Sequence, residues 1–310
     1  MNDNAMKRRH FLQVSTATAL GAGLLASSPQ AVKAHTPARL RKAVIDNNLP
    51  KGLSEAKQFA LAKRCGFDGI ESWAGKDKLA NLDAAKERGK IAREEGVPIH
   101  SLIYGWWPPF TNTDPEVIGK SIKEMEDTLA YAQAVGAGSV LLVPTRVTDD
   151  FRYADAYQRS QEYVRRLIPV AERTGVVIAL ENVWNRFLIS PMEFARYIDE
   201  LNSPWVQAYF DVGNILIHGN PQDWILTLGK RINRLHVKGC KQVSGQEVKG
   251  INRGYKFVNL LEGSINWKAV GQAIHTIGYQ GWITAEVGGG DEAFLTDLAQ
   301  RMDKIIAMAS

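Results

Sequence analysis

The chain has 310 residues, 45% of them hydrophobic, which is enough for one large α/β domain with a sizeable core. Its formal net charge is +5, but the first 34 residues hold four basic residues and one acidic residue, so the remainder carries only +2. A body so close to neutral gives no electrostatic reason to expect a nucleic acid as a partner.

The first 34 residues have the three-part order of a signal peptide. A basic run at residues 7–9 precedes an apolar Phe-Leu pair, a weakly hydrophobic stretch follows over residues 14–26, and small or modest side chains occupy residues 32–34. Paired arginines in this place are typical of the twin-arginine (Tat) variant. We therefore predict export to the periplasm or the exterior, with a domain over residues 38–310. No stretch reaches the roughly 20 consecutive apolar residues of a membrane span, so no membrane partner is expected after cleavage.

From residue 41 onward, short β-branched segments alternate with helical segments that contain charges. The predicted strands cover residues 42–46, 68–73, 98–103, 139–144, 176–181, 206–211, 234–238 and 282–287. Helices are predicted between them, for example at residues 53–64, 82–95, 115–135, 157–173 and 267–277. Eight alternating units without a domain break predict an α/β protein of the (β/α)₈ TIM-barrel class.

An open, doubly wound sheet is the alternative fold. It would usually show a glycine-rich phosphate loop after an early strand, and the sequence has none there. The longest segment predicted to be irregular, Gly239–Ile265, follows the seventh strand and should lie on the face where barrel enzymes build active sites. Cys65 and Cys240 are far apart in the sequence and are expected to be ordinary core thiols.

Four potential metal ligands stand at the carboxyl ends of the last four predicted strands: Glu181, Asp211, His236 and Glu286. A charged group is costly to bury unless it is paired or binds a metal, and three carboxylates at one barrel end would repel one another without a cation. Oxygen-rich ligation with one histidine suits Mn²⁺ best, with Mg²⁺ or Co²⁺ as alternatives, rather than a structural zinc. We predict one divalent metal ion, and unrelated salt bridges are the competing interpretation.

These segments, together with Leu-Glu-Gly-Ser-Ile-Asn-Trp at residues 261–267, resemble the xylose isomerase-like sugar epimerase/isomerase family from about residue 41 to the C-terminus. The resemblance implies that the four residues bind one divalent metal. It also implies that Glu181 and Glu286 act as the acid/base pair on opposite faces of a keto sugar, while Asp211 and His236 serve as ligands only.

The sequence departs from the family pattern at two positions. Many epimerases have a histidine where this chain has Asn214, and many have an aspartate where it has Gly239. Asn214 can still hydrogen-bond a sugar hydroxyl, but a second metal is not expected. The departures leave the identity of the substrate open.

Further substrate-binding residues are predicted around this group. Lys238 shares its strand and its inward direction with His236, so it could bind a substrate oxygen or pair with a carboxylate. The resemblance gives Glu71 and His100 substrate-contacting positions, although His100 fits a satisfied barrel histidine equally well. Aromatic side chains that suit sugar faces follow strands two, three and five: Trp73, Trp106, Trp107, Phe110 and Trp184. Arg186 and Arg253 in the mouth loops could meet an anionic substrate.

The leading hypothesis is a divalent-metal-dependent epimerase or isomerase of a keto sugar or a related polyol derivative. The metal would acidify a carbon-bound hydrogen and stabilise the resulting enediolate, and two carboxylates would move the proton. The same groups would serve a lyase or dehydratase acting on a 3-keto sugar. A non-catalytic, exported sugar-binding barrel is a further alternative.

An endonuclease IV-type DNA repair enzyme shares the barrel but needs three zinc ions and more histidines than the six present here. The sequence does not reveal which sugar is used, whether it is phosphorylated, or which metal is physiological. It leaves the oligomeric state open and is compatible with a homo-oligomer.

Overall fold

The computed structural model of the chain describes residues 40–106, 112–243 and 254–309. The predicted signal peptide at residues 1–34, the aromatic residues Trp107 and Phe110, and Arg253 lie outside these described residues. All described residues belong to one unit, which spans residues 35–310. Among them, no helix combines the length and apolar character that crossing a membrane requires.

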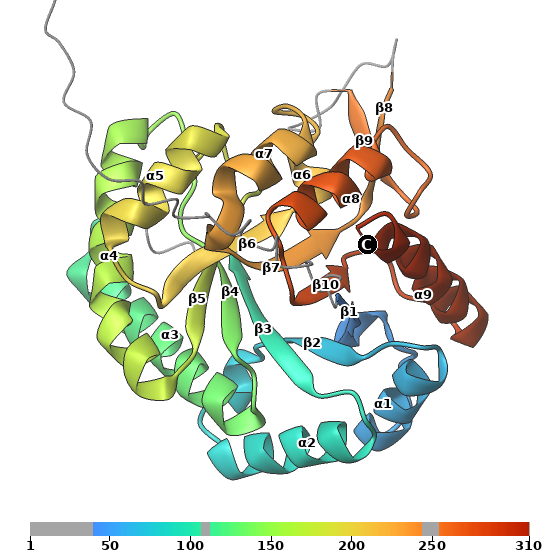
Figure 1. Cartoon of the computed structure of the whole chain (residues 1–310). Coiled ribbons are helices and arrows are strands. Elements are labelled where there is room, and N and C mark those ends of the chain that lie inside the picture. Colours follow the sequence, from blue (N-terminus) through green and yellow to red (C-terminus); the bar gives the residue numbers. More distant parts are fainter. Residues whose placement is uncertain (1–39, 107–111, 244–253, 310) are drawn as a thin grey trace, which may run out of the picture. The chain divides into compact units, whose positions relative to one another are not determined.

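Eight parallel strands close into a barrel, which confirms the predicted TIM barrel and excludes the open sheet (Figure 1). Pairing of the first strand with the last, in which Ala43 aligns with Thr284, closes the ring. The barrel strands are β1 (Arg41–Ile45), β2 (Gly69–Trp73), β3 (Ile99–Trp106), β4 (Ser139–Val143), β5 (Val177–Glu181), β6 (Val206–Asp211), β7 (Ile232–Val237) and β10 (Trp282–Ala285).

Helices surround the barrel and connect successive strands (Figure 1). They are α1 (Glu55–Arg64), α2 (Leu82–Glu94), α3 (Pro115–Val135), α4 (Tyr153–Thr174), α5 (Pro191–Leu201), α7 (Pro221–Leu228), α8 (Trp267–Thr276) and α9 (Glu292–Ala307). The short helix α6 (Val212–Ile215) follows β6 directly. Gly136 and Gly175 end α3 and α4 with φ angles of 89° and 67°, the left-handed conformation that glycine adopts without strain.

The alternation of side chains along each strand separates the core from the site. On β6, Ala208 and Phe210 face outward into the large apolar layer between strands and helices. Tyr209 instead belongs to a small cluster inside the barrel, and Asp211 follows it on the same face. Because successive side chains of a strand point to opposite faces, every second residue of β5, β6 and β7 points into the barrel. The last inward-pointing residue of each of these strands is a predicted ligand.

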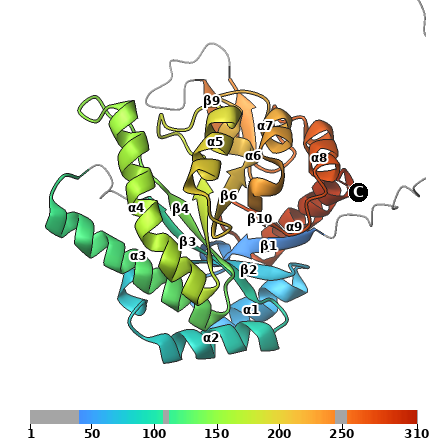
Figure 2. The ribbon, with the colours of Figure 1, turned by 60° about the vertical axis from the view of Figure 1, so that its left-hand side comes forward.

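The segment predicted to be irregular after the seventh strand contains a hairpin instead. Strand β8 (Gly239–Gln242) pairs antiparallel with β9 (Tyr255–Val258), and Figure 2 shows β9 near the top of the view. The prediction of irregular structure is therefore wrong for these two strands. They were missed because each has only four residues and carries no long alternating pattern. Phe257 of β9 lines the cavity at the barrel mouth.

Candidate metal centre at the barrel mouth

The four predicted ligands come from four adjacent strands of the barrel. Glu181 and Asp211 are the last residues of β5 and β6, His236 lies one residue before the end of β7, and Glu286 directly follows β10. The order of the strands in the barrel is β5, β6, β7, β10, so the four side chains meet at one side of the mouth. One potential ligand atom from each residue lies within 4.8 Å of all the others.

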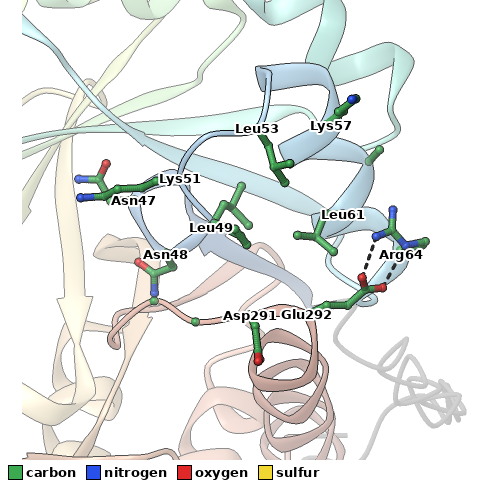
Figure 3. A pocket seen from close by; sticks show the side chains of 14 residues that line it. Asn47, Asn48, Leu49, Lys51, Leu53, Lys57, Leu61, Arg64, Asp291 and Glu292 are labelled. Carbon is green, nitrogen blue, oxygen red and sulfur yellow. Dashed lines mark hydrogen bonds and ion pairs between the residues drawn. The ribbon is translucent and has the colours of Figure 1, made fainter.

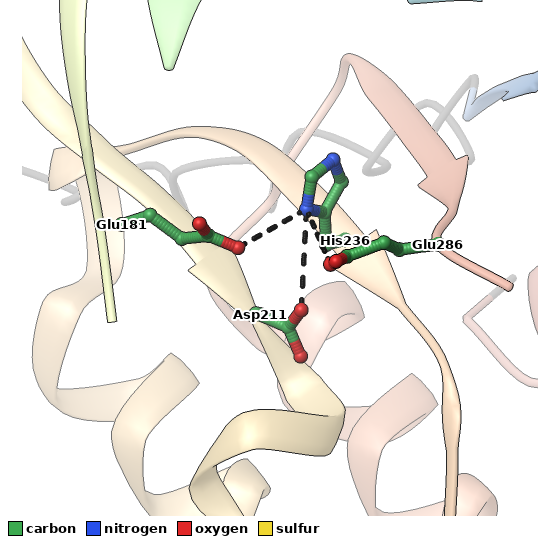
Figure 4. A group of neighbouring side chains, drawn as sticks. All are labelled: Glu181, Asp211, His236 and Glu286. Carbon is green, nitrogen blue, oxygen red and sulfur yellow. Dashed lines mark hydrogen bonds and ion pairs between the residues drawn. The ribbon is translucent and has the colours of Figure 1, made fainter. Parts of the chain in front are cut away.

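The three carboxylates converge on one nitrogen of the histidine ring. His236 Nδ1 lies 3.1 Å from Glu286 Oε2, 3.3 Å from Glu181 Oε1 and 3.9 Å from Asp211 Oδ2. Figure 4 shows Glu181 and Glu286 approaching this nitrogen from opposite sides. Glu181, Asp211 and His236 are buried, whereas the Glu286 side chain keeps 37% of its surface exposed.

The charges of this group call for a cation. Asp211 Oδ2 and Glu286 Oε2 are buried atoms, and both form ion pairs with the Lys238 ammonium, at 2.9 and 2.7 Å. One lysine offsets only one of the three carboxylates. The remaining two negative charges, together with three oxygen donors and one imidazole nitrogen, fit a single divalent metal ion.

The same crowding shifts the pKa values of the acids. Burial, opposed by the charge of Lys238, raises the pKa of Asp211 to about 7, and burial also raises the pKa of Glu181. Burial would raise the pKa of Glu286 as well, but a hydrogen bond from His236 and the charge of Lys238 outweigh it and lower that pKa. Full ionisation of the buried acids is therefore costly in the protein alone, and a bound cation would remove that cost.

Two residues predicted to contact substrate, Glu71 and His100, are buried and do not line the cavity at the mouth. Glu71 is fully buried and accepts a hydrogen bond from His236 Nε2 at 2.8 Å, on the side of the ring away from the carboxylates. His100 lies 3.1 Å from Thr284 Oγ1 through its Nε2 and stacks on Trp282, with ring centroids 4.4 Å apart. Neither residue lines the cavity at the mouth, so the structure favours the alternative interpretation of His100 as a buried barrel histidine.

Asn214 and Lys238, which were predicted to lie near the four ligands, do line the cavity at the mouth. The Asn214 backbone N–H donates to Asp211 Oδ1 at 2.8 Å, and its side-chain amide donates to the Asn182 carbonyl at 2.9 Å. Asn182 in turn exchanges two hydrogen bonds with the Asp211 backbone. Sequence reasoning missed Asn182, although its position directly after Glu181 was a usable signal.

The cavity beside the four predicted ligands has a volume of about 200 Å³ and aromatic walls. Trp184 and Phe257 stack with their ring centroids 4.9 Å apart, and the Lys238 ammonium lies 4.9 Å from the Phe257 centroid. Trp73 also lines this cavity, with 44% of its surface exposed. Arg186 instead contacts Asp149 at 3.5 Å and is not among the lining residues. A small cavity with apolar walls and convergent polar groups is typical of a site for a small molecule.

A larger cavity, of about 900 Å³, opens between the segment after β1, helix α1 and the loop before α9 (Figure 3). Of the charged residues that line it, Arg64 and Glu292 are paired with each other through contacts of 3.1 and 3.0 Å. It contains none of the clustered ligands. We therefore place the candidate site at the smaller cavity, because that cavity is lined by the histidine and by two of the clustered carboxylates.

Comparison with known proteins gives concordant matches. The sequence pattern of the xylose isomerase-like TIM barrel family matches residues 59–305. The putative L-ribulose-5-phosphate 3-epimerase SgbU of Escherichia coli (strain K12) is 27% identical over 253 residues, which cover 79% of this chain and 87% of that protein. The L-ribulose-5-phosphate 3-epimerase UlaE of Escherichia coli (strain SMS-3-5) is 25% identical, with 77% and 84% covered. A crystal structure of D-psicose 3-epimerase has the same fold, with a TM-score of 0.69 at 15% identity over 87% of this chain and 99% of that one.

Proposed function

Because the chain belongs to the xylose isomerase-like TIM barrel family, we propose that it is a divalent-metal-dependent epimerase or isomerase of a keto sugar or a related polyol derivative. The relatives named above are sugar epimerases, which supports this class of reaction. The observation that carries the proposal is the convergence of Glu181, Asp211, His236 and Glu286, with the two glutamates on opposite sides of the cluster (Figure 4).

The four residues would hold one ion, for which Mn²⁺ is the best fit and Mg²⁺ or Co²⁺ would serve. When bound, the ion would supply electrostatic stabilisation of the negative charge that develops on the substrate oxygens. Asp211 and His236 would act as ligands only. Lys238 would offset the third carboxylate and keep Asp211 and Glu286 in place through its two ion pairs.

The two glutamates would carry the proton. Each directs one oxygen towards the cluster, Oε1 of Glu181 and Oε2 of Glu286, and has a second oxygen left for substrate. One glutamate takes the proton from the carbon next to the carbonyl, and the C–H electron pair moves into a carbon–carbon double bond as the carbonyl oxygen becomes negative. Return of a proton to the same carbon from the opposite glutamate inverts that centre. Return to the neighbouring carbon gives the isomer, provided that the hydroxyl proton moves to the former carbonyl oxygen as the new carbonyl forms.

The experiment is metal analysis of the purified protein, followed by a screen of ketoses and keto-glycosides in D₂O monitored by NMR. We expect about one divalent ion per chain and deuterium at the carbon next to the carbonyl of the product. An unsaturated product would indicate the lyase or dehydratase instead. Stoichiometric sugar binding without deuterium at any carbon would leave only the non-catalytic sugar-binding barrel.

We also propose export by the twin-arginine route, on the strength of the basic, apolar and small-residue order of residues 1–34. That route moves folded proteins, which suits a protein that must acquire its metal where competing metals are controlled. Replacement of Arg8 and Arg9 by lysine should keep the protein in the cytoplasm, as measured by cell fractionation. Unchanged export of that variant would contradict the proposal.

A further inference from the structure

Both nitrogens of the His236 ring have carboxylate neighbours, but on opposite sides. Nδ1 faces Glu181, Asp211 and Glu286, the group that would hold the metal (Figure 4). Nε2 faces Glu71 alone, with 2.8 Å between Nε2 and Glu71 Oε2. A histidine can ligate a metal only through a nitrogen that carries no proton, so the proton on the other nitrogen decides which face of the ring binds.

Glu71 belongs to the opposite part of the barrel. It lies on β2, whose neighbours in the sheet are β1 and β3, whereas His236 lies on β7. Glu71 is fully buried and is not among the residues that line the cavity at the mouth. It therefore reaches the metal centre only through the histidine ring.

Tyr209 holds the Glu71 carboxylate in this position. Its hydroxyl donates to Glu71 Oε2 at 2.7 Å, and its ring packs on His236 with centroids 4.3 Å apart. The other carboxylate oxygen, Oε1, has no hydrogen-bond partner among the described residues. The Tyr209 hydroxyl and His236 Nε2 thus both contact Glu71 Oε2. An ionised carboxylate has no proton to donate, so it can only accept hydrogen bonds from these two groups.

We propose that Glu71, held by Tyr209, is a positioning residue that keeps the proton of His236 on Nε2 and so presents Nδ1 to the metal. The inference rests on the proposed metal site, but not on any particular sugar or reaction. Without Glu71, the nearest acceptors for a ring proton are Glu181 and Glu286 on the Nδ1 side, and a proton there occupies the position that a metal would take. Loss of a carboxylate that orients a ligating histidine typically weakens metal binding by about 10- to 100-fold.

The test measures Mn²⁺ affinity by calorimetry in the absence of any sugar. We expect Glu71→Gln to weaken binding by about 10- to 100-fold, because an amide can donate to Nε2 as well as accept from it. Tyr209→Phe keeps the ring contact and removes the hydroxyl, so we expect a smaller loss of several-fold. Glu55→Gln is the matched control, since Glu55 pairs with Arg88 on the outside of the barrel and should bind Mn²⁺ like the unmodified protein.

A second readout reports the ring itself. In Zn²⁺-loaded protein with ¹⁵N-labelled histidine, long-range ¹H–¹⁵N spectra should show His236 with a protonated Nε2 and a ligated Nδ1, and that pattern should weaken or exchange in Glu71→Gln. Mn²⁺ affinity within twofold of the unmodified protein, with an unchanged pattern, would overturn the proposal. A raised KM with unchanged metal affinity would instead return Glu71 to substrate contact. If Glu71→Gln does not fold, unchanged affinity in Tyr209→Phe overturns the proposal.

These outcomes separate the inference from the proposed function. Tight Mn²⁺ binding without turnover of any ketose would defeat the epimerase proposal and leave the role of Glu71 standing. Normal turnover together with unchanged Mn²⁺ affinity in Glu71→Gln would defeat the role of Glu71 and leave the epimerase proposal standing.

Discussion

Glu181 and Glu286 carry the same functional group in different surroundings. Glu181 is buried, whereas Glu286 is partly exposed to the cavity and forms an ion pair with Lys238. An amide at either position keeps an oxygen for the metal but cannot take up a proton from carbon.

Glu286→Gln should therefore retain much of the metal and lose deuterium exchange into the substrate by about 10²- to 10⁴-fold, the usual contribution of a general acid or base. Metal analysis and NMR in D₂O measure the two effects separately. The matched control is Glu292→Gln, an exposed residue paired with Arg64 that should exchange normally. Full exchange in Glu286→Gln would remove its acid/base role.

His100 should make the stability of the protein depend on pH. Burial, together with the nearby positive charges of Arg234 and Arg41, lowers its pKa well below the usual 6.5. As the pH falls below about 6.5, the unfolded chain binds a proton that native His100 does not, so the free energy of unfolding decreases. His100→Gln can still hydrogen-bond Thr284 and should show a shallower decrease between about pH 6.5 and about pH 5. Urea unfolding at several pH values in this range measures how steeply the free energy of unfolding falls in each protein. Equal slopes for the unmodified protein and His100→Gln would refute the role given to His100.

At the scale of the elements, the barrel was predictable because each strand is a short apolar run that ends at a recognisable residue. The sequence predicted the ends of β5 and β6 correctly, since the runs stop at the buried acids Glu181 and Asp211. The four-residue strands β8 and β9 were not predictable, because their pairing depends on packing against the barrel mouth. Contact between Glu71 and His236 was equally hidden, since local sequence does not show which side of a ring a distant strand will meet.

Gly239 shows how the hairpin restricts the sequence. A Cβ atom there would lie 2.1 Å from the Asn259 carbonyl oxygen and 2.4 Å from that of Val258, both backbone atoms that cannot move aside cheaply. An aspartate here, as the family resemblance would suggest, would clash with these two oxygens, so the glycine has a steric reason.

Gly239→Ala should therefore separate β8 from β9 and shift Phe257 away from the cavity. We expect a higher KM with metal binding preserved, and a loss of stability of roughly 1–3 kcal/mol, the usual cost of overpacking. The matched control is Gly119→Ala on the exposed face of α3, where an added Cβ meets nothing within 4 Å. That substitution should stabilise the helix by about 0.5–1 kcal/mol. A Gly239→Ala variant as stable as the unmodified protein would show that the hairpin can move.

At the scale of the whole barrel, one ion would join four of the eight strands, so metal binding should stabilise the native state. At a free metal concentration of about 100 times Kd the gain is roughly 2.7 kcal/mol, which corresponds to a rise in Tm of several degrees. Thermal melts in EDTA and after addition of Mn²⁺ measure it. Asp211→Asn is the matched variant and should show a much smaller rise. No change in Tm with Mn²⁺, Mg²⁺ or Co²⁺ would count against the metal centre.

The contact between Glu71 and His236 joins parts of the polypeptide that are made at different times. Residue 71 leaves the ribosome well before residue 236, and Glu286 emerges later still. Residues close to His236 in the sequence therefore do not supply this contact. The contact with Glu71 forms only when β2 and β7 are brought together in the closed barrel. A half-synthesised chain would offer an ion no finished coordination shell, so the proposed site could be loaded with metal only after translation has delivered the last strand.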